Sequence, residues 1–84
     1  MRKIDGKYQT SGDITKLDGT PIPDDEPLIL FRGKDKLLLP LLDYYQVLCK
    51  DAGSPDNQID LLGEQIGKIK AWQAGHADRL KVPD

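Results

Sequence analysis

Large apolar side chains gather in two short runs of this chain, Leu28–Phe31 and Leu37–Leu42, whereas residues 1–27 contain few of them. The core has to form around these runs, because burial of apolar surface is the main favourable contribution to folding. The chain has 84 residues, enough for one domain, and such a domain buries only about 60% of the surface of its unfolded chain. We therefore expect a small α+β domain with a thin core, and we expect it to form a homo-oligomer that enlarges this core.

Residues 1–27 are predicted to form a short hairpin or an irregular arm. The dipeptides Asp5-Gly6 and Asp18-Gly19 are typical of tight hairpin turns. The segments Lys7–Thr10 and Ile14–Leu17, which lie between turn signals, are candidates for extended structure. Three prolines between positions 21 and 27 then restrict the backbone to extended conformations. The arm is therefore expected to lead through a stiff, acidic connector into residues 28–84.

The run Leu28–Phe31 is predicted to be a buried strand. It is apolar at every position and lies between Pro27 and Gly33, which is typical of a strand covered on both faces. A strand cannot stand alone, because its unpaired backbone groups would be costly to bury. We therefore expect its partner to come from the N-terminal arm or from a second subunit.

A first helix is predicted from a cap at Asp35 to about Asp51. Pro40 disturbs this pattern, since its ring would oppose the carbonyl of Lys36. Either the first turn is tightened, or the regular helix begins at Pro40. Gly53 is expected to end the helix in a left-handed conformation. The face expected to be buried recurs at helical spacing and consists of Leu38, Leu42, Tyr45 and Cys49.

A second helix is predicted to begin with Ser54 as its cap and Pro55 in its first turn, and to end at Gly75. Its core face is expected to contain Ile59, Leu62, Ile66, Ile69 and Gln73. Gly63 and Gly67 lie four residues apart on an adjoining face, where two missing side chains would let another backbone approach closely. Trp72 lies beside the core stripe. Gly63, Gly67 and Trp72 are therefore the candidate interface residues.

The composition excludes several classes of protein. A net charge of −2 argues against a protein that coats duplex nucleic acid, since such proteins are usually basic. The single cysteine, Cys49, excludes an internal disulfide framework. No apolar run is long enough to cross a membrane, and no hydrophobic segment follows Met1-Arg2-Lys3. We therefore expect a cytoplasmic protein with no membrane association.

No catalytic or metal-binding set can be recognised among the residues. Asp24-Asp25-Glu26 lacks the glycine and terminal glutamate of a calcium loop, so a solvated acidic connector is favoured. His76 is the only histidine, and zinc binding or acid–base chemistry needs more partners, so a surface or capping role is expected. We expect no cofactor, no metal and no enzymatic activity.

A basic turn connects the predicted strand to the first helix. Arg32, Lys34 and Lys36 surround Gly33 and lie next to a helix N-terminus. Backbone donors, cationic side chains and a glycine that allows close approach are the components of phosphate sites, and arginine can add a two-point contact. The alternative is purely structural: Gly33 makes the turn, Asp35 caps the helix, and the cations are solvated or pair with carboxylates.

Part of the chain resembles a known group of sequences. Residues 19–35, GTPIPDDEPLILFRGKD, are followed by Tyr44-Tyr45, by Leu48-Cys49 and by a closing segment Asp78–Asp84. This arrangement is similar to short uncharacterised proteins of bacteria and their phages that carry the same kind of box. The resemblance covers residue 18 to the end of the chain. It implies a phage or mobile-element origin, and it implies no catalytic residue.

Two functions follow from these observations as hypotheses. In the first, Arg32, Gly33, Lys34, Lys36 and a stacking Tyr44 bind an anionic small molecule such as a nucleotide, and in a phage the protein could sequester a host defence signal. In the second, the helical surface docks a second copy or a host protein that it inhibits. Tyr44 could instead lie at the rim of the core, because its ring is amphipathic.

Overall fold

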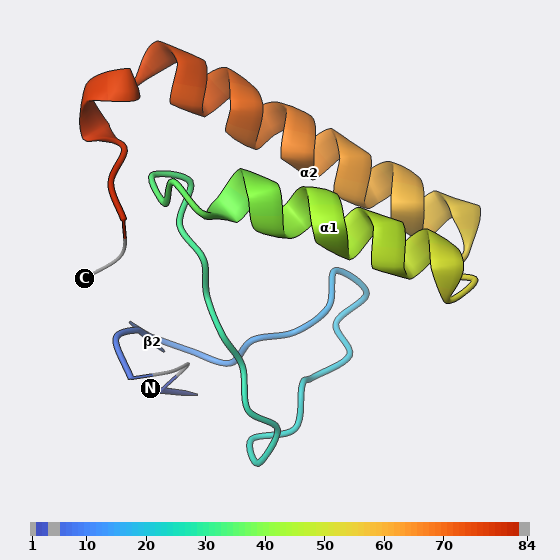
Figure 1. Ribbon diagram of the computed structural model, residues 1–84. Coiled ribbons are helices and arrows are strands. Elements are labelled where there is room, and N and C mark those ends of the chain that lie inside the picture. Colours follow the sequence, from blue (N-terminus) through green and yellow to red (C-terminus); the bar gives the residue numbers. More distant parts are fainter. Residues whose placement is uncertain (1, 4–5, 83–84) are drawn as a thin grey trace. The chain divides into compact units, whose positions relative to one another are not determined.

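A computed structural model describes residues 2–3 and 6–82. The chain divides into two compact units, one reaching to Leu30 and the other starting at Phe31. The elements, in chain order, are β1 (Arg2–Lys3), β2 (Gln9–Thr10), α1 (Leu38–Asp51), α2 (Asp56–Gly75) and the short 3-10 helix η1 (Ala77–Arg79) (Figure 1). The described chain is thus mostly helical with a minor sheet, and the expected α+β class holds only in this coarse sense.

The N-terminal unit contains a short hairpin, as the sequence predicts. β1 and β2 pair in an antiparallel register that places Arg2 opposite Thr10 and Lys3 opposite Gln9. Gln9–Thr10 also falls inside the predicted extended segment Lys7–Thr10. Asp5 of the predicted Asp5-Gly6 turn lies outside the described residues.

A second turn in this unit forms at Asp18-Gly19, where the sequence predicts one. Gly19 has a φ of 89°, a left-handed conformation that glycine adopts without steric cost. The Asp18 carboxylate accepts a hydrogen bond from the Thr20 backbone N–H at 2.9 Å. An isolated antiparallel bridge joins Thr15, before the turn, to Pro21, after it.

The prediction of a buried strand at Leu28–Phe31 is wrong. These residues adopt no regular secondary structure, and Ile29, Leu30 and Phe31 are 70%, 44% and 45% exposed. The physical reason is that a strand needs a neighbouring strand to bond its backbone. Within residues 2–3 and 6–82, the paired strands and isolated bridges lie elsewhere in the chain. Apolar character alone therefore did not produce a strand.

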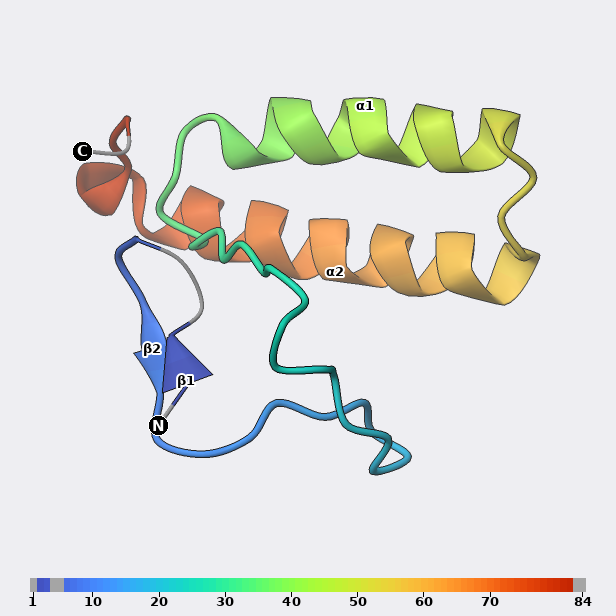
Figure 2. The same cartoon turned by 90° about the horizontal axis from the view of Figure 1, so that it is seen from below.

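The C-terminal unit is a helical hairpin in which α1 and α2 run antiparallel, side by side (Figures 1 and 2). Its buried apolar side chains among the described residues are Leu38 and Ile66, which are 3% and 5% exposed. The predicted core face of α2 is confirmed, because every other member of its stripe is half-buried. On α1, Leu42 and Cys49 are half-buried as expected, but Tyr45 is 54% exposed.

α1 begins at Leu38, so both predicted starting points are wrong. Pro40 is the third residue of the helix, within the first turn, where a backbone N–H has no partner in the helix and its absence costs little. Asp35 lies before the helix rather than capping it: its Oδ1 accepts a hydrogen bond from the Leu37 N–H at 2.8 Å. The residue as a whole is 8% exposed. It therefore stabilises the turn that leads into α1.

α1 ends at Asp51, as predicted, and Gly53 follows it in the predicted left-handed conformation, with a φ of 80°. The Gly53 N–H donates to the Lys50 carbonyl at 3.2 Å, and the Ser54 N–H donates to the Cys49 carbonyl at 2.9 Å. This pair of bonds is the Schellman arrangement that satisfies the last carbonyls of a helix. The predicted cap of α2 is wrong by one residue, because Pro55 holds the N-cap position and Ser54 makes no capping bond.

α2 ends at Gly75, as predicted, and η1 follows it. Neither helix of the described chain combines the length and the apolar composition that a membrane span requires.

Candidate functional site

A groove in the C-terminal unit is the candidate site, and it has a volume of about 340 Å³. We call it the basic groove. Its walls come from the segment before α1, from the first residue of α1, from α2 and from η1. The residues that line it are Phe31, Arg32, Gly33, Lys34, Leu38, Gln65, Lys68, Ile69, Trp72 and Arg79.

One side of the groove is a face of α2. Gln65, Lys68, Ile69 and Trp72 have the spacing i, i+3, i+4 and i+7, which places them on one side of a helix. Ile69 belongs both to this face and to the core stripe of α2. The groove therefore lies at the edge of the packed helical interface, where apolar side chains meet solvent.

The opposite side is the segment Phe31–Lys34, held in place from two directions. The Gln73 side-chain amide donates to the Gly33 carbonyl at 2.9 Å and to the Asp35 carbonyl at 3.2 Å. The C-terminal segment adds backbone bonds: the Lys36 N–H donates to the Lys81 carbonyl at 3.0 Å, and the Lys81 N–H donates to the Lys34 carbonyl at 3.1 Å. This segment is therefore fixed by tertiary bonds although it has no regular structure of its own.

Trp72 organises the end of the groove next to η1. Its ring stacks on the His76 ring, with centroids 4.3 Å apart and planes 14° from parallel. The Arg79 guanidinium lies 5.0 Å from the Trp72 ring centroid, within the range of a cation–π interaction. His76 is the C-cap residue of α2, and its Nδ1 lies 2.7 Å from the Trp72 carbonyl. The expected capping role of His76 is thus confirmed.

The charge of the groove is positive. Arg32, Lys34, Lys68 and Arg79 are all basic, and no aspartate or glutamate is found among the described residues that line the groove. The start of α1 adds little, because the Leu37 and Leu38 N–H groups are bonded to the Asp35 carboxylate and carbonyl. The basic side chains, rather than the helix N-terminus, are therefore the groups that can contact an anion.

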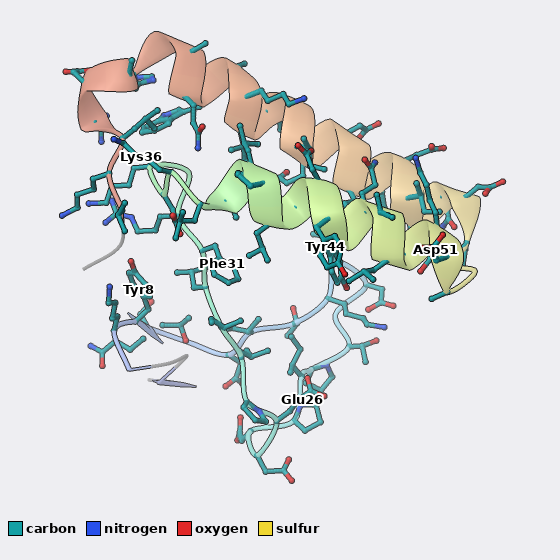
Figure 3. All side chains as sticks on the ribbon, viewed as in Figure 1. Tyr8, Glu26, Phe31, Lys36, Tyr44 and Asp51 are labelled. Carbon is teal, nitrogen blue, oxygen red and sulfur yellow. The ribbon has the colours of Figure 1, made fainter. Side chains whose placement is uncertain are left out.

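The structure brings together only some of the predicted ligand residues. Arg32, Gly33 and Lys34 line the groove, whereas Lys36 and Tyr44 do not. Tyr44 is 63% exposed and projects from the middle of α1, while Phe31 and Lys36 lie on the segment leading into that helix (Figure 3).

The predicted interface residues do not form one surface with common surroundings. Trp72 lies in the basic groove. A Cβ on Gly63 would lie 3.4 Å from Nε2 of Gln46, so this glycine faces a side chain of α1. At Gly67 a Cβ would meet no described atom within 4 Å. The two glycines therefore have different surroundings, and only Gly67 leaves open space.

Sequence reasoning missed two basic residues of the groove, Lys68 and Arg79. Lys68 could have been found, because it lies one turn before Trp72 on the same helical face. Arg79 carries no such signal, since its position depends on how η1 turns back after α2.

A second pocket of about 420 Å³ lies at the other end of the helical hairpin. It is lined by Tyr45, Cys49, Ser54, Gln58, Ile59, Leu61 and Leu62. All of these residues are uncharged, so this pocket offers no group that would attract an ion. Among residues 2–3 and 6–82, no three histidine, cysteine, aspartate or glutamate side chains gather as a metal site requires.

The basic groove therefore combines a positive charge, an apolar wall and a fixed backbone, which together suit an organic anion. No protein family, curated protein or solved structure matches the chain.

Proposed function

We propose that the protein binds a small anionic, nucleotide-like molecule in the basic groove. The observation that carries this proposal is the convergence of four basic side chains from three segments of the chain on one groove that has no acidic lining residue among those described. Like charges gathered in a concave site raise the local concentration of an oppositely charged ligand. Arginine and lysine provide N–H donors, and phosphate oxygens accept hydrogen bonds from them.

The proposal is one of binding without catalysis. Among the described residues that line the groove there is no serine, threonine, cysteine, histidine, aspartate or glutamate. Nucleophilic and acid–base catalysis draw mostly on those residue types. Lysine can serve in both as well, but no second acid–base group accompanies Lys34 and Lys68 among the described residues that line the groove. A groove of arginine, lysine, glutamine and apolar side chains is better suited to holding an anion than to transforming it.

The resemblance to short phage and bacterial proteins extends this proposal to a biological role. A phage protein that holds a nucleotide without changing it would lower the free concentration of that nucleotide in the host cytoplasm. We propose on this basis that the ligand is a host defence signal and that the protein sequesters it.

Calorimetric titration of the purified protein with a panel of nucleotides tests the binding proposal. Arg32→Ala should weaken binding by about 10- to 100-fold, since a hydrogen bond to a charged group contributes about 1.5–3 kcal/mol. Lys36→Ala is the matched control, because Lys36 lies on the same segment but outside the groove, and it should change the affinity less than about twofold. Absence of heat with every nucleotide would overturn the proposal.

A second candidate function, protein interaction through the helical surface, is favoured by a different observation. Leu37, Leu41, Tyr44 and Leu48 are 55%, 43%, 63% and 45% exposed. They follow a 4-3-4 spacing that is typical of helix–helix pairing. We propose that this stripe docks a second copy of the chain or a host protein.

The native mass in solution and Leu41→Glu test this alternative. Self-association through the stripe predicts a dimer or larger species that Leu41→Glu converts to a monomer, whereas Lys70→Glu, on the exposed side of α2, leaves it intact. A protein that is monomeric at high concentration and captures no partner from host extract would contradict the interaction function.

A further inference from the structure

The lining of the basic groove divides into two chemical halves. Phe31, Leu38, Ile69 and Trp72 are apolar, and the four basic side chains form the other half. An inorganic anion would contact only the basic half and would leave the apolar half facing water. The apolar half therefore constrains the ligand as strongly as the charge does.

Phe31 is the aromatic side chain of the groove whose exposed surface can contact a ligand. Trp72 already stacks on His76 and lies beside Arg79. Phe31 is 45% exposed and immediately precedes Arg32 in the same wall. A planar ring placed against Phe31 would cover apolar surface while leaving its charged substituent within reach of Arg32. Ring-on-ring contact of this kind tolerates different bases, because every base has a π face.

The side chains of the basic half come from different segments of the chain, so they can contact more than one phosphate group. Arg32 precedes α1, Lys68 lies on α2, and Arg79 lies on η1. Lys68 and Trp72, the residue that Arg79 contacts, are one helical turn apart, which corresponds to a rise of about 6 Å. The phosphate group of a monophosphate carries at most two negative charges, whereas Arg32, Lys68 and Arg79 bring three positive charges to the groove. Charge complementarity favours a ligand with more than one phosphate group.

On the basis of the proposed function, we infer that the ligand is a ring-bearing polyphosphate of the nucleoside diphosphate or triphosphate class. Its ring contacts Phe31, and its phosphate groups lie between Arg32, Lys68 and Arg79. The class excludes free pyrophosphate, which lacks the ring, and nucleoside monophosphates, which lack the second phosphate group.

Four sets of probes separate these requirements: the common nucleoside diphosphates and triphosphates, the matching monophosphates, the free nucleosides and pyrophosphate. Binding is followed by calorimetry and by the fluorescence of Trp72, the only tryptophan in the chain. The best diphosphate should bind about tenfold more tightly than its monophosphate and than pyrophosphate, and the nucleosides should not bind detectably.

Two variants test the apolar half and the basic half of the groove separately. Phe31→Ala should weaken diphosphate binding about tenfold and leave pyrophosphate binding unchanged, because only the ring contact is lost. Lys68→Ala should weaken both. Circular dichroism of each variant checks that the helices are intact.

The outcomes distinguish this inference from the proposal on which it rests. If pyrophosphate binds as tightly as the diphosphates and Phe31→Ala has no effect, the ligand does not need a ring. The proposal of anion binding would still stand. If monophosphates bind as tightly as diphosphates, the ligand does not need a second phosphate group. Failure of all four sets of probes to bind would overturn the proposed function itself.

Discussion

The side-chain amide of Gln73 in α2 bonds to the backbone carbonyl of Gly33, with an N···O distance of 2.9 Å. The same nitrogen also donates to the Asp35 carbonyl. One side chain of the helical hairpin thus holds the segment that carries Arg32 and Lys34 into the basic groove. The irregular wall of the groove therefore depends on a residue that does not line it.

Gln73→Ala should lower the free energy of unfolding by about 1–3 kcal/mol, because it removes both hydrogen bonds and takes the side-chain donor away from the half-buried Gly33 carbonyl. The Asp35 carbonyl keeps its bond from the Leu38 N–H. Urea unfolding followed by circular dichroism gives the change. Gln58→Ala, at an exposed position near the other end of the same helix, should have an effect within about 0.5 kcal/mol. Equal effects of the two substitutions would show that the bonds of Gln73 do not stabilise the fold.

Two glycine substitutions should change the free energy of unfolding in opposite directions. Gly53→Ala places a Cβ at a φ of 80° and should destabilise the protein by about 1 kcal/mol or more. Gly67→Ala lies within α2, where a Cβ meets no described neighbour within 4 Å, and should stabilise it by up to about 1 kcal/mol. Thermal unfolding of both variants measures the difference. A destabilising Gly67→Ala would mean that another chain packs against this position.

The Asp35 carboxylate should stabilise the entry to α1. Asp35→Ala removes the acceptor for the Leu37 N–H and should cost about 1–2 kcal/mol in unfolding free energy. Asp35→Asn retains a side-chain oxygen and should recover much of this loss. Comparison of the two variants by chemical unfolding separates the hydrogen bond from the charge, and equal losses would assign the effect to the charge.

The Asp18 carboxyl should titrate below its ordinary range. The Thr20 backbone N–H, and then its hydroxyl, lower the pKa of Asp18 from the ordinary value of 3.8. Because the folded pKa is the lower one, this carboxylate favours the folded turn above the unfolded pKa. The contribution is lost as the pH falls through the folded pKa. An NMR titration of the carboxyl carbon measures the shift.

Thr20→Val tests the cause of that shift. The variant keeps the backbone N–H, which is the larger contribution, and removes the hydroxyl. The pKa of Asp18 should therefore rise part of the way towards 3.8 and remain below it. A complete return to the ordinary value would contradict the main role of the backbone bond.

The features that could be predicted from the sequence are the local ones. The turn at Gly19, the end of α1 just before Gly53 and the end of α2 at Gly75 are encoded by neighbouring residues. The core stripe of α2 is likewise a matter of helical spacing. Leu28–Phe31 could not be predicted, because a strand depends on a partner elsewhere in the chain, and apolar composition says nothing about whether that partner exists.

The candidate site was predictable only in part for the same reason. Arg32, Gly33 and Lys34 are neighbours in sequence, and their pattern was sufficient to single them out. Lys68 and Arg79 reach the groove only after α2 packs against α1 and η1 turns back. Tyr44 is close to the basic turn along the chain, but it lies on α1 and does not line the groove.

The backbone pairing of Asp35 with Lys81 is parallel, which has a mechanical consequence. When the two ends of the C-terminal unit are pulled apart, paired parallel segments slide past each other instead of opening one bond at a time. The bonds between Lys36 and Lys81 and between Lys81 and Lys34 therefore share the load. Tension on the chain should therefore leave the segment before α1 in place until both bonds rupture together.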